Sequence, residues 1–260
     1  MAVGGLIQRG GRRRRSRAAL GSLLLVAGLA LAPAAEARLK VTFSKRILTV
    51  KGGAKSERIS VFCSAEGKVR MNGRNPNGGP IACSRVVEVD VLAGDGDDRI
   101  DMRGVGARFG EARFRGFGTG TGVAAIGGPG ADRLIGSGRA FNLFLAGPGN
   151  DRGSGGRRRD ILSGGAGADQ FKGHGGRDTL LGKGGPDSLN GGDGRDLVSG
   201  NAGDDGLRGG PGDDVLGGGF GRDRLRGGRG DDRLLGGPGK DLLDGGPGRD
   251  TLIQDPPRRR

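Results

Sequence analysis

The sequence predicts an all-β protein built from short stacked repeats, and three observations support this prediction. A nine-residue period runs without insertion from residue 146 to residue 253. The chain of 260 residues contains 62 Gly and 11 Pro, a content typical of repeat architectures when it follows such a period. Segments of alternating apolar and polar residues precede the repeats and are typical of β-strands.

Residues 1–37 are predicted to be a signal peptide. Five arginines within residues 12–17 precede an uncharged apolar run of 15 residues at 18–32, and Ala35-Glu36-Ala37 provides a small-x-small cleavage site. The alternative is an uncleaved membrane anchor, but a transmembrane helix needs about 20 residues. We therefore expect cleavage after Ala37 and a secreted, extracellular protein.

Residues 38–92 are predicted to form an N-terminal β-strand segment. Strands are expected over residues 39–44, 46–52, 58–63, 68–73 and 86–91. The basic residues of this segment mostly take the polar positions of the alternation, which favours a solvated strand face over a binding patch. We expect the segment to cap the first coil of the repeats, because an open strand edge would otherwise pair with other chains.

The chain contains two cysteines, Cys63 and Cys83. An oxidising extracellular compartment favours a disulfide between them. Closing a loop of about 20 residues would contribute on the order of 3 kcal/mol. Two buried free thiols are the alternative.

The composition excludes several classes of function. The single histidine, His174, excludes sites that need two imidazoles, and no G-x-S-x-G elbow, P-loop or C-x-x-C pair is present. The formal net charge of +14 lies outside the repeats, because residues 146–253 contain 16 Lys and Arg against 17 Asp. Two Arg-Gly-Gly sequences, at 208–210 and 226–228, suggest RNA or DNA binding, but such tracts use interleaved aromatic residues. We therefore predict no nucleic-acid partner.

The twelve units of the repeat share a strict pattern. Gly fills positions 1, 2 and 4 in most units, and Asp fills position 6 in all twelve. Position 8 is apolar except at Gly153, so one side chain per unit is expected to point inward.

Looser copies of the unit occur before the regular repeats, at residues 93–101 and 127–135. The ten-residue stretch 136–145 has Phe141 in the Asp position and breaks the register. Residues 93–145 are therefore predicted to be irregular, degenerate repeats, and residues 254–260 a basic tail.

The pattern G-G-x-G-x-D-x-U-x, in which U is a large apolar residue, resembles the nonapeptide of the repeats-in-toxin (RTX, hemolysin-type) calcium-binding proteins. The resemblance is dense over residues 146–253 and loose over 93–145. It implies a parallel β-roll, a β-solenoid in which two units make one coil and the glycine-rich turns bind Ca²⁺.

Such a roll places each unit above the unit two positions later, about 4.8 Å away, so the acids of position 6 are expected to form two ladders. Carboxylates this close repel each other unless a cation lies between them, and Ca²⁺ accepts six to eight oxygen ligands. Glycine-turn carbonyls supply the remaining ligands in the family, and up to about ten ions are expected in the regular array. The expected metal-binding residues are Asp151, Asp169, Asp187, Asp205, Asp223 and Asp241 in one ladder, Asp160, Asp178, Asp196, Asp214, Asp232 and Asp250 in the other, and Asp98 and Asp132 in the looser copies.

The alternative is that these aspartates only cap turns, but turn capping would also tolerate Asn and Ser. Some loops depart from the pattern and are expected to bind Ca²⁺ weakly. These departures are Arg158 at position 4 and His174, Lys183 and Asn201 at position 2. His174 is expected to be an exposed turn residue, because the array offers no partner His or Cys. Arginines at position 5 should lower the affinity unless they point into solvent; they are Arg159, Arg177, Arg195, Arg222 and Arg249.

The leading hypothesis for function is a secreted calcium-binding protein that folds on binding Ca²⁺ and has a structural or surface- or matrix-associated role. It is predicted not to be an enzyme, because the residues before the repeats contain no recognisable catalytic constellation. The alternatives are the calcium-repeat portion of a secreted enzyme and an RGG-type nucleic-acid-binding protein. Calcium ions are the predicted partners, an unknown cell-surface or matrix partner is left open, and no stable membrane span is expected after signal cleavage.

Overall fold

A computed structural model describes residues 40–72, 74, 76, 79–106 and 122–255, together with the backbone of residues 112–114 and 118–120. The predicted signal peptide and most of the predicted basic tail lie outside the described residues. Within them the chain consists of β-strands and a single 3₁₀ turn, η1 (Cys83–Arg85). The predicted all-β fold class is confirmed.

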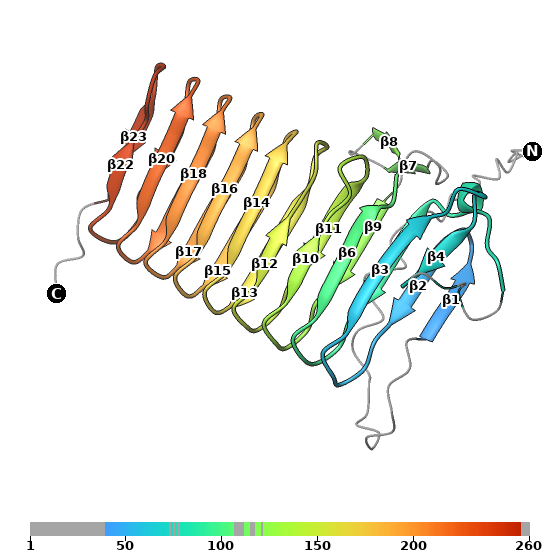
Figure 1. Ribbon diagram of the computed structural model, residues 1–260. Coiled ribbons are helices and arrows are strands. Elements are labelled where there is room, and N and C mark those ends of the chain that lie inside the picture. Colours follow the sequence, from blue (N-terminus) through green and yellow to red (C-terminus); the bar gives the residue numbers. More distant parts are fainter. Residues whose placement is uncertain are drawn as a thin grey trace, which may run out of the picture. The chain divides into compact units, whose positions relative to one another are not determined.

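Two long sheets carry the fold (Figure 1). The order in the 11-stranded sheet, called sheet A, is β1 (Lys40–Ser44), β2 (Ile47–Lys51), β5 (Glu88–Leu92), β9 (Gly122–Ile126), β11 (Phe141–Leu145), β13 (Ile161–Ala166), β15 (Thr179–Gly184), β17 (Leu197–Ala202), β19 (Val215–Phe220), β21 (Arg233–Leu235) and β23 (Thr251–Ile253). The order in the 10-stranded sheet, called sheet B, is β4 (Val69–Met71), β3 (Arg58–Cys63), β6 (Arg99–Gly104), β10 (Arg133–Ile135), β12 (Arg152–Ser154), β14 (Gln170–Gly175), β16 (Ser188–Asp193), β18 (Gly206–Pro211), β20 (Arg224–Arg229) and β22 (Leu242–Asp244). A separate hairpin pairs β7 (Ala112–Phe114) with β8 (Gly118–Gly120).

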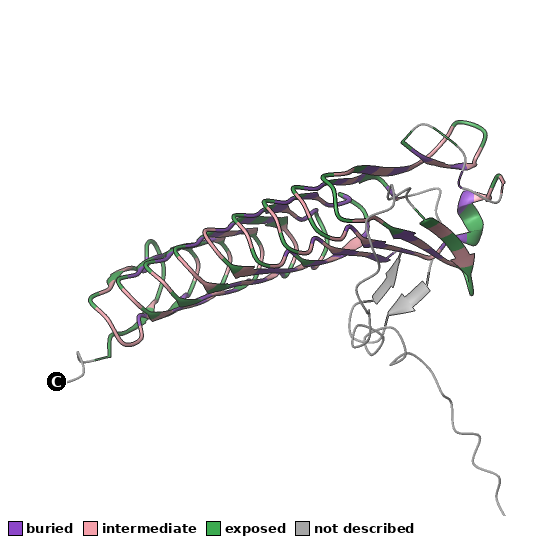
Figure 2. Ribbon diagram, turned by 90° about the horizontal axis from the view of Figure 1, so that it is seen from below, coloured by how far each residue is buried: buried purple, intermediate pink, exposed green. Residues whose placement is uncertain are grey.

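The strands of the repeats are parallel, and each residue lies beside the residue 18 positions later. Leu180 lies beside Val198 in sheet A, and Phe171 lies beside Leu189 in sheet B. Successive units contribute alternately to the two sheets, which produces the stacked coils seen in Figure 2. This arrangement confirms the predicted coil of two nonapeptides. The described residues contain no helix long and apolar enough to cross a membrane.

The side chains of position 8 fill the space between the two sheets. From Leu162 to Leu234 each of them is at most 3% exposed. Gly153 is the exception in this column, and a Cβ there would lie 2.2 Å from ring carbons of Phe171 on the next coil of sheet B. The glycine therefore makes room for the larger neighbouring ring. In the last coil Leu252 is 49% exposed.

The N-terminal strands join the same two sheets as the repeats. Leu48 of β2 lies beside Val89 of β5, and Ile59 of β3 lies beside Ile100 of β6, in parallel register. Each of these four side chains is at most 1% exposed. The antiparallel strands β1 and β4 then form the outer edge of sheet A and of sheet B. Strand pairing and apolar contacts therefore run continuously from these edges into the array.

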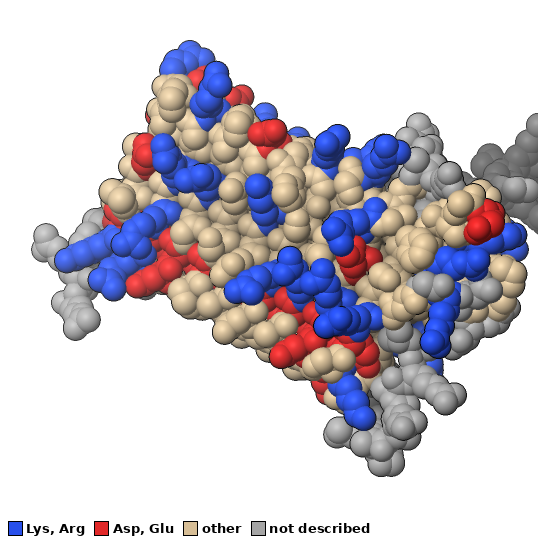
Figure 3. All heavy atoms as spheres, viewed as in Figure 1, with Lys and Arg blue, Asp and Glu red and all other residues tan. Residues whose placement is uncertain are grey.

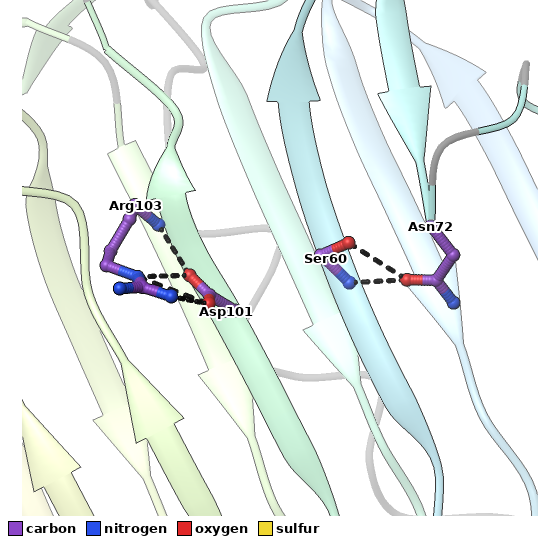
Figure 4. A network of polar contacts seen from close by, with 4 residues as sticks. All are labelled: Ser60, Asn72, Asp101 and Arg103. Carbon is purple, nitrogen blue, oxygen red and sulfur yellow. Dashed lines mark hydrogen bonds and ion pairs between the residues drawn. The ribbon is translucent and has the colours of Figure 1, made fainter.

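Local contacts hold this first part of the fold together. Cys63 of β3 and Cys83 of η1 form a disulfide with a Cα–Cα distance of 6.0 Å. Asn72, which follows β4, accepts hydrogen bonds from the backbone N–H and the hydroxyl of Ser60 at 2.8 and 3.1 Å (Figure 4). On the neighbouring β6, the Arg103 guanidinium donates to both carboxylate oxygens of Asp101.

Candidate metal centre

The turns before each strand depend on glycine because neighbouring coils approach each other closely. Gly212, at position 4, has a φ of 138°, and a Cβ there would lie 1.6 Å from the carbonyl oxygen of Gly194 on the preceding coil. Only glycine combines this backbone conformation with such a close approach. The spacing of the glycines thus brings main-chain carbonyls of successive turns close together.

The aspartates of position 6 form the two predicted ladders. In the first ladder the backbone N–H of Asp187 donates to Oδ1 of Asp205 at 2.8 Å, and the N–H of Asp205 donates to Oδ1 of Asp223 at 2.8 Å. The same bond links every adjacent pair of both ladders, from Asp151 to Asp241 and from Asp160 to Asp250. Ten of these twelve residues are at most 3% exposed, and Asp241 and Asp250 in the last coil are partly buried.

The first ladder extends into the looser copies. Oδ1 of Asp151 accepts from the N–H of Asp132, and Oδ1 of Asp132 accepts from the N–H of Asp98. Oδ1 of Asp98 in turn accepts from the N–H of Glu57 at 2.7 Å. Asp98 and Asp132 therefore occupy the same structural position as the regular aspartates.

The second ladder begins at Asn142, which the sequence analysis missed. We expected Phe141 in the Asp position of residues 136–145, and this expectation is wrong. The N–H and Nδ2 of Asn142 both donate to Oδ1 of Asp160 at 2.8 Å. The extra residue of this stretch is accommodated in the preceding turn, where Oδ1 of Asn142 accepts from the N–H of Ser137. Counting back 18 residues from Asp160 would have identified Asn142.

Most ladder carboxylates keep one oxygen without a partner. Oδ2 is buried and makes no hydrogen bond in ten of the described aspartates of this position, namely Asp98, Asp132, Asp151, Asp178, Asp187, Asp196, Asp205, Asp214, Asp223 and Asp232. An unpartnered buried carboxylate oxygen costs free energy unless a proton or a cation neutralises it. Its repetition in successive coils points to a ligand that the chain itself does not provide.

A main-chain oxygen lies close to seven of these ten carboxylate oxygens. The position that a Cβ on Gly182 would take is 2.0 Å from Oδ2 of Asp187 and 2.9 Å from the carbonyl oxygen of Gly200, one coil further on. The same pair of oxygens surrounds position 1 at Gly209, with distances of 2.3 and 2.7 Å. Two hard oxygens thus converge beside a position kept free of a side chain, and such donors fit Ca²⁺.

A metal ion in the ladders would need main-chain carbonyl oxygens among its ligands. The described residues contain no group of three or more His, Cys, Asp or Glu side chains placed to hold a metal ion. A cation between two turns would therefore depend on carbonyl oxygens as well as on the two carboxylates of a ladder step.

The turns of units 155–163 and 164–172 differ from those of the other units. In these units the N–H of the position-2 glycine, Gly156 or Gly165, donates to Oδ2 of Asp160 or Asp169. These two carboxylates are already satisfied by the chain, and the first of them belongs to the unit with Arg158. By contrast, His174, Lys183 and Asn201 keep the left-handed backbone of position 2, with φ of 82°, 85° and 76°. The carboxylates of these three units retain an unpartnered Oδ2.

Burial dominates the electrostatics of the ladders. It raises the pKa of Asp178 to about 8 and the pKa of Asp187 and Asp214 to about 7, and neighbouring ladder carboxylates add to the effect. Backbone N–H donors act in the opposite direction but are outweighed. In the metal-free chain protons and cations would therefore compete for these oxygens near neutral pH.

Four of the five arginines of position 5 are exposed, namely Arg177, Arg195, Arg222 and Arg249, and Arg159 is partly buried. Arg222 and Arg249 form ion pairs with Asp204 and Asp231, one coil before them, and their side chains are 74% and 92% exposed. His174 is also exposed, and its Nε2 lies 2.8 Å from Oγ of Ser154. Arg222 and Arg249 are therefore screened by solvent and contribute little repulsion to a cation in the ladders.

Comparison with known proteins agrees with this geometry. Residues 145–180, 181–216 and 217–252 each match the family model described as the RTX calcium-binding nonapeptide repeat (4 copies). Three matches of four copies account for the twelve units that the period defines. No curated protein with a similar sequence was found. Residues 145–252 of this chain are therefore similar to the RTX calcium-binding nonapeptide repeats.

Proposed function

We propose that this chain is a secreted, extracellular calcium-binding protein whose repeats bind Ca²⁺ between stacked turns and fold on binding, in a structural or surface- or matrix-associated role without catalysis. The observation that carries the proposal is the row of buried, unpartnered Oδ2 atoms, seven of which lie beside a main-chain carbonyl of the next coil.

Folding on binding is supported by the balance of forces within the array. Nine of the twelve regular units bury the apolar side chain of position 8, whereas the many glycines of the array lose a large backbone entropy on ordering. Each unit also buries one carboxylate beside two others of the same ladder. A bound Ca²⁺ supplies the positive charge that offsets this repulsion, and it stabilises the folded state because it binds that state alone.

The residues of the chain have separate tasks in this proposal. Oδ1 of each aspartate accepts the N–H of the preceding coil and thereby orients the carboxylate. Oδ2 and the position-1 carbonyl of the next coil are the proposed ligands. Glycine at position 1 leaves the space between them open. Asp160 and Asp169, whose Oδ2 atoms accept main-chain N–H groups, are proposed to bind more weakly.

A calcium titration of the calcium-free protein tests the proposal. Far-UV circular dichroism should change from a largely unfolded to a β-rich spectrum, and calorimetry should detect several ions per chain. Asp196→Asn should lower the number of bound ions. Asp193→Asn, the same change at an exposed residue of the same unit, should not. A β-rich spectrum that persists in excess chelator, or equal effects of the two substitutions, would contradict the proposal.

A further inference from the structure

The near-zero net charge of the repeats hides a separation of charge between inside and outside. Residues 146–253 contain 16 Lys and Arg against 17 Asp. Twelve of the aspartates belong to the ladders, which leaves five outside them: Asp193, Asp204, Asp213, Asp231 and Asp244. The outer surface of the array therefore carries 16 basic residues against five acidic ones, and Ca²⁺ in the ladders would not neutralise it.

The basic residues are concentrated on one sheet. Lys172, Asn190, Arg208 and Arg226 occupy position 9 on four adjacent strands of sheet B, where each lies beside the next. The equivalent column of sheet A has no charged residue from β11 to β23; it contains Leu145, Ser163, Leu181, Ser199, Gly217, Leu235 and Ile253. The fold accepts uncharged residues at position 9, so it does not by itself require the cations of sheet B.

A second basic column lies on the same face, at the place of position 7, on the strands nearer the N-terminus. Arg58, Arg99, Arg133 and Arg152 lie side by side on β3, β6, β10 and β12, and all four are exposed. Sheet B faces the viewer in Figure 1, and Lys and Arg side chains are spread along this face, outnumbering Asp and Glu (Figure 3).

A groove of about 940 Å³ runs across β14, β16, β18 and β20 on this face. Gly192, Gly210 and Gly228 of position 2 line it, together with the position-9 residues Lys172, Arg208 and Arg226. Arg157 and Arg229 of position 3 also line it, and among the described residues that line it Asp193 is the one acidic residue. Three glycines of position 2 thus lie between cations on either side, and His174 continues their column at one end.

We propose that this basic groove binds a linear acidic polysaccharide, with the polymer lying along the stacking direction and its carboxylates meeting the cations of β14, β18 and β20. The strand repeat of about 4.8 Å is close to the length of one sugar in an extended uronic acid chain. Guanidinium groups bind carboxylates through paired hydrogen bonds. Single-stranded nucleic acids are disfavoured because they are held largely by stacking on aromatic rings, and none of the described residues that line the groove is Phe, Tyr or Trp.

The test measures binding of a short fluorescent oligogalacturonate by anisotropy, with its methyl ester as the uncharged control ligand. The full chain is used at the lowest calcium concentration that completes its circular dichroism change. Lys172→Ser together with Arg208→Asn should weaken binding about tenfold, and binding should weaken further with added salt. Ser154 and Asn190 occupy the same column, so both substitutions introduce residues that the column already contains.

Arg177→Ser together with Arg195→Ser is the matched control, because these exposed arginines lie outside the groove and removing them changes the net charge equally. This variant should change the affinity less than about twofold. Equal losses in the two variants, no binding by the folded wild type, equal binding of the methyl ester, or equal binding of an oligothymidylate would overturn the proposal. The inference rests on the folded array of the proposed function. Circular dichroism reports on that folding and anisotropy reports on the groove, so the two can fail separately.

Discussion

Substitution of Asp205 separates the two tasks of a ladder carboxylate. Oδ1 of this residue accepts the N–H of Asp187 at 2.8 Å, while its buried Oδ2 has no partner in the chain. Asp205→Asn keeps an oxygen acceptor for the N–H and removes the charge. Asn142, which occupies the same position of the second ladder, indicates that the fold accepts this change. Asp205→Ala removes both the acceptor and the charge.

The expected magnitudes follow from the position of Asp205 between Asp187 and Asp223. Either substitution should remove two calcium ions, because one proposed site lies on each side of the residue. Asp250, the last residue of its ladder, has a ladder neighbour only at Asp232, so Asp250→Asn should remove one ion. Asp205→Ala should cost a further 1–3 kcal/mol or so relative to Asp205→Asn, because the buried N–H of Asp187 loses its acceptor.

The assay is the calcium content of each gel-filtered variant, together with its free energy of unfolding in denaturant at fixed calcium. Equal losses of bound calcium from Asp205→Asn and Asp250→Asn would refute the stacking of sites along a ladder. Equal stability of Asp205→Asn and Asp205→Ala would refute the role assigned to Oδ1.

Three further predictions concern the array and its N-terminal strands. Without calcium the folded state should be more stable at pH 5 than at pH 8, as followed by circular dichroism in metal-free buffer. Burial raises the pKa of Asp178 to about 8 and of Asp187 to about 7, so this stabilisation is complete below the unfolded-state pKa and is lost as the pH rises through these values. Lys183→Gly should stabilise the calcium-loaded protein by about 1 kcal/mol in denaturant unfolding, because Lys183 has a φ of 85°, whereas Lys172→Gly on a regular strand should not. In hydrogen exchange, chelation should deprotect residues 146–253 before residues 40–92, and reduction of the disulfide should act on residues 40–92 alone; equal deprotection of both parts by chelator would contradict this order.

The repeat made most of the fold predictable. A period of nine residues with Asp at position 6 and an apolar residue at position 8 predicts the inward column and the two ladders, and the observed register of 18 residues agrees. The same pattern accounts for Gly153 only when the next coil is considered, because the space is needed by Phe171. Considering each unit by itself cannot detect that Gly153 and Phe171 share this space.

Features that depend on contacts between coils were harder to predict from the sequence. Asn142 was missed because its stretch was aligned from the preceding unit, whereas the extra residue lies in the turn before it. The hydrogen bonds of Gly156 and Gly165 to Asp160 and Asp169 depend on local turn conformation, which the repeated glycines leave open. The sequence analysis also missed the basic outer face, because a net charge of −1 for residues 146–253 does not distinguish inward from outward side chains.

The residues at the ladder position indicate that the N-terminal strands and the repeat array are stabilised differently, although they share the same sheets. Along sheet A the position of the ladder residue is taken first by apolar side chains, Leu48, Val89 and Val123, then by Asn142, and then by aspartates. The apolar side chains contribute roughly 1.5–3 kcal/mol each on burial, whereas buried carboxylates oppose folding until they are neutralised. We expect the N-terminal strands to fold without metal. Because the sheets are continuous, these strands would then present a paired edge on which the first coils of the array can form. Under the proposed function calcium would be needed chiefly to extend the stack along the acidic ladders, and we expect its loss to unfold the array from the last coil, where Leu252 is half exposed.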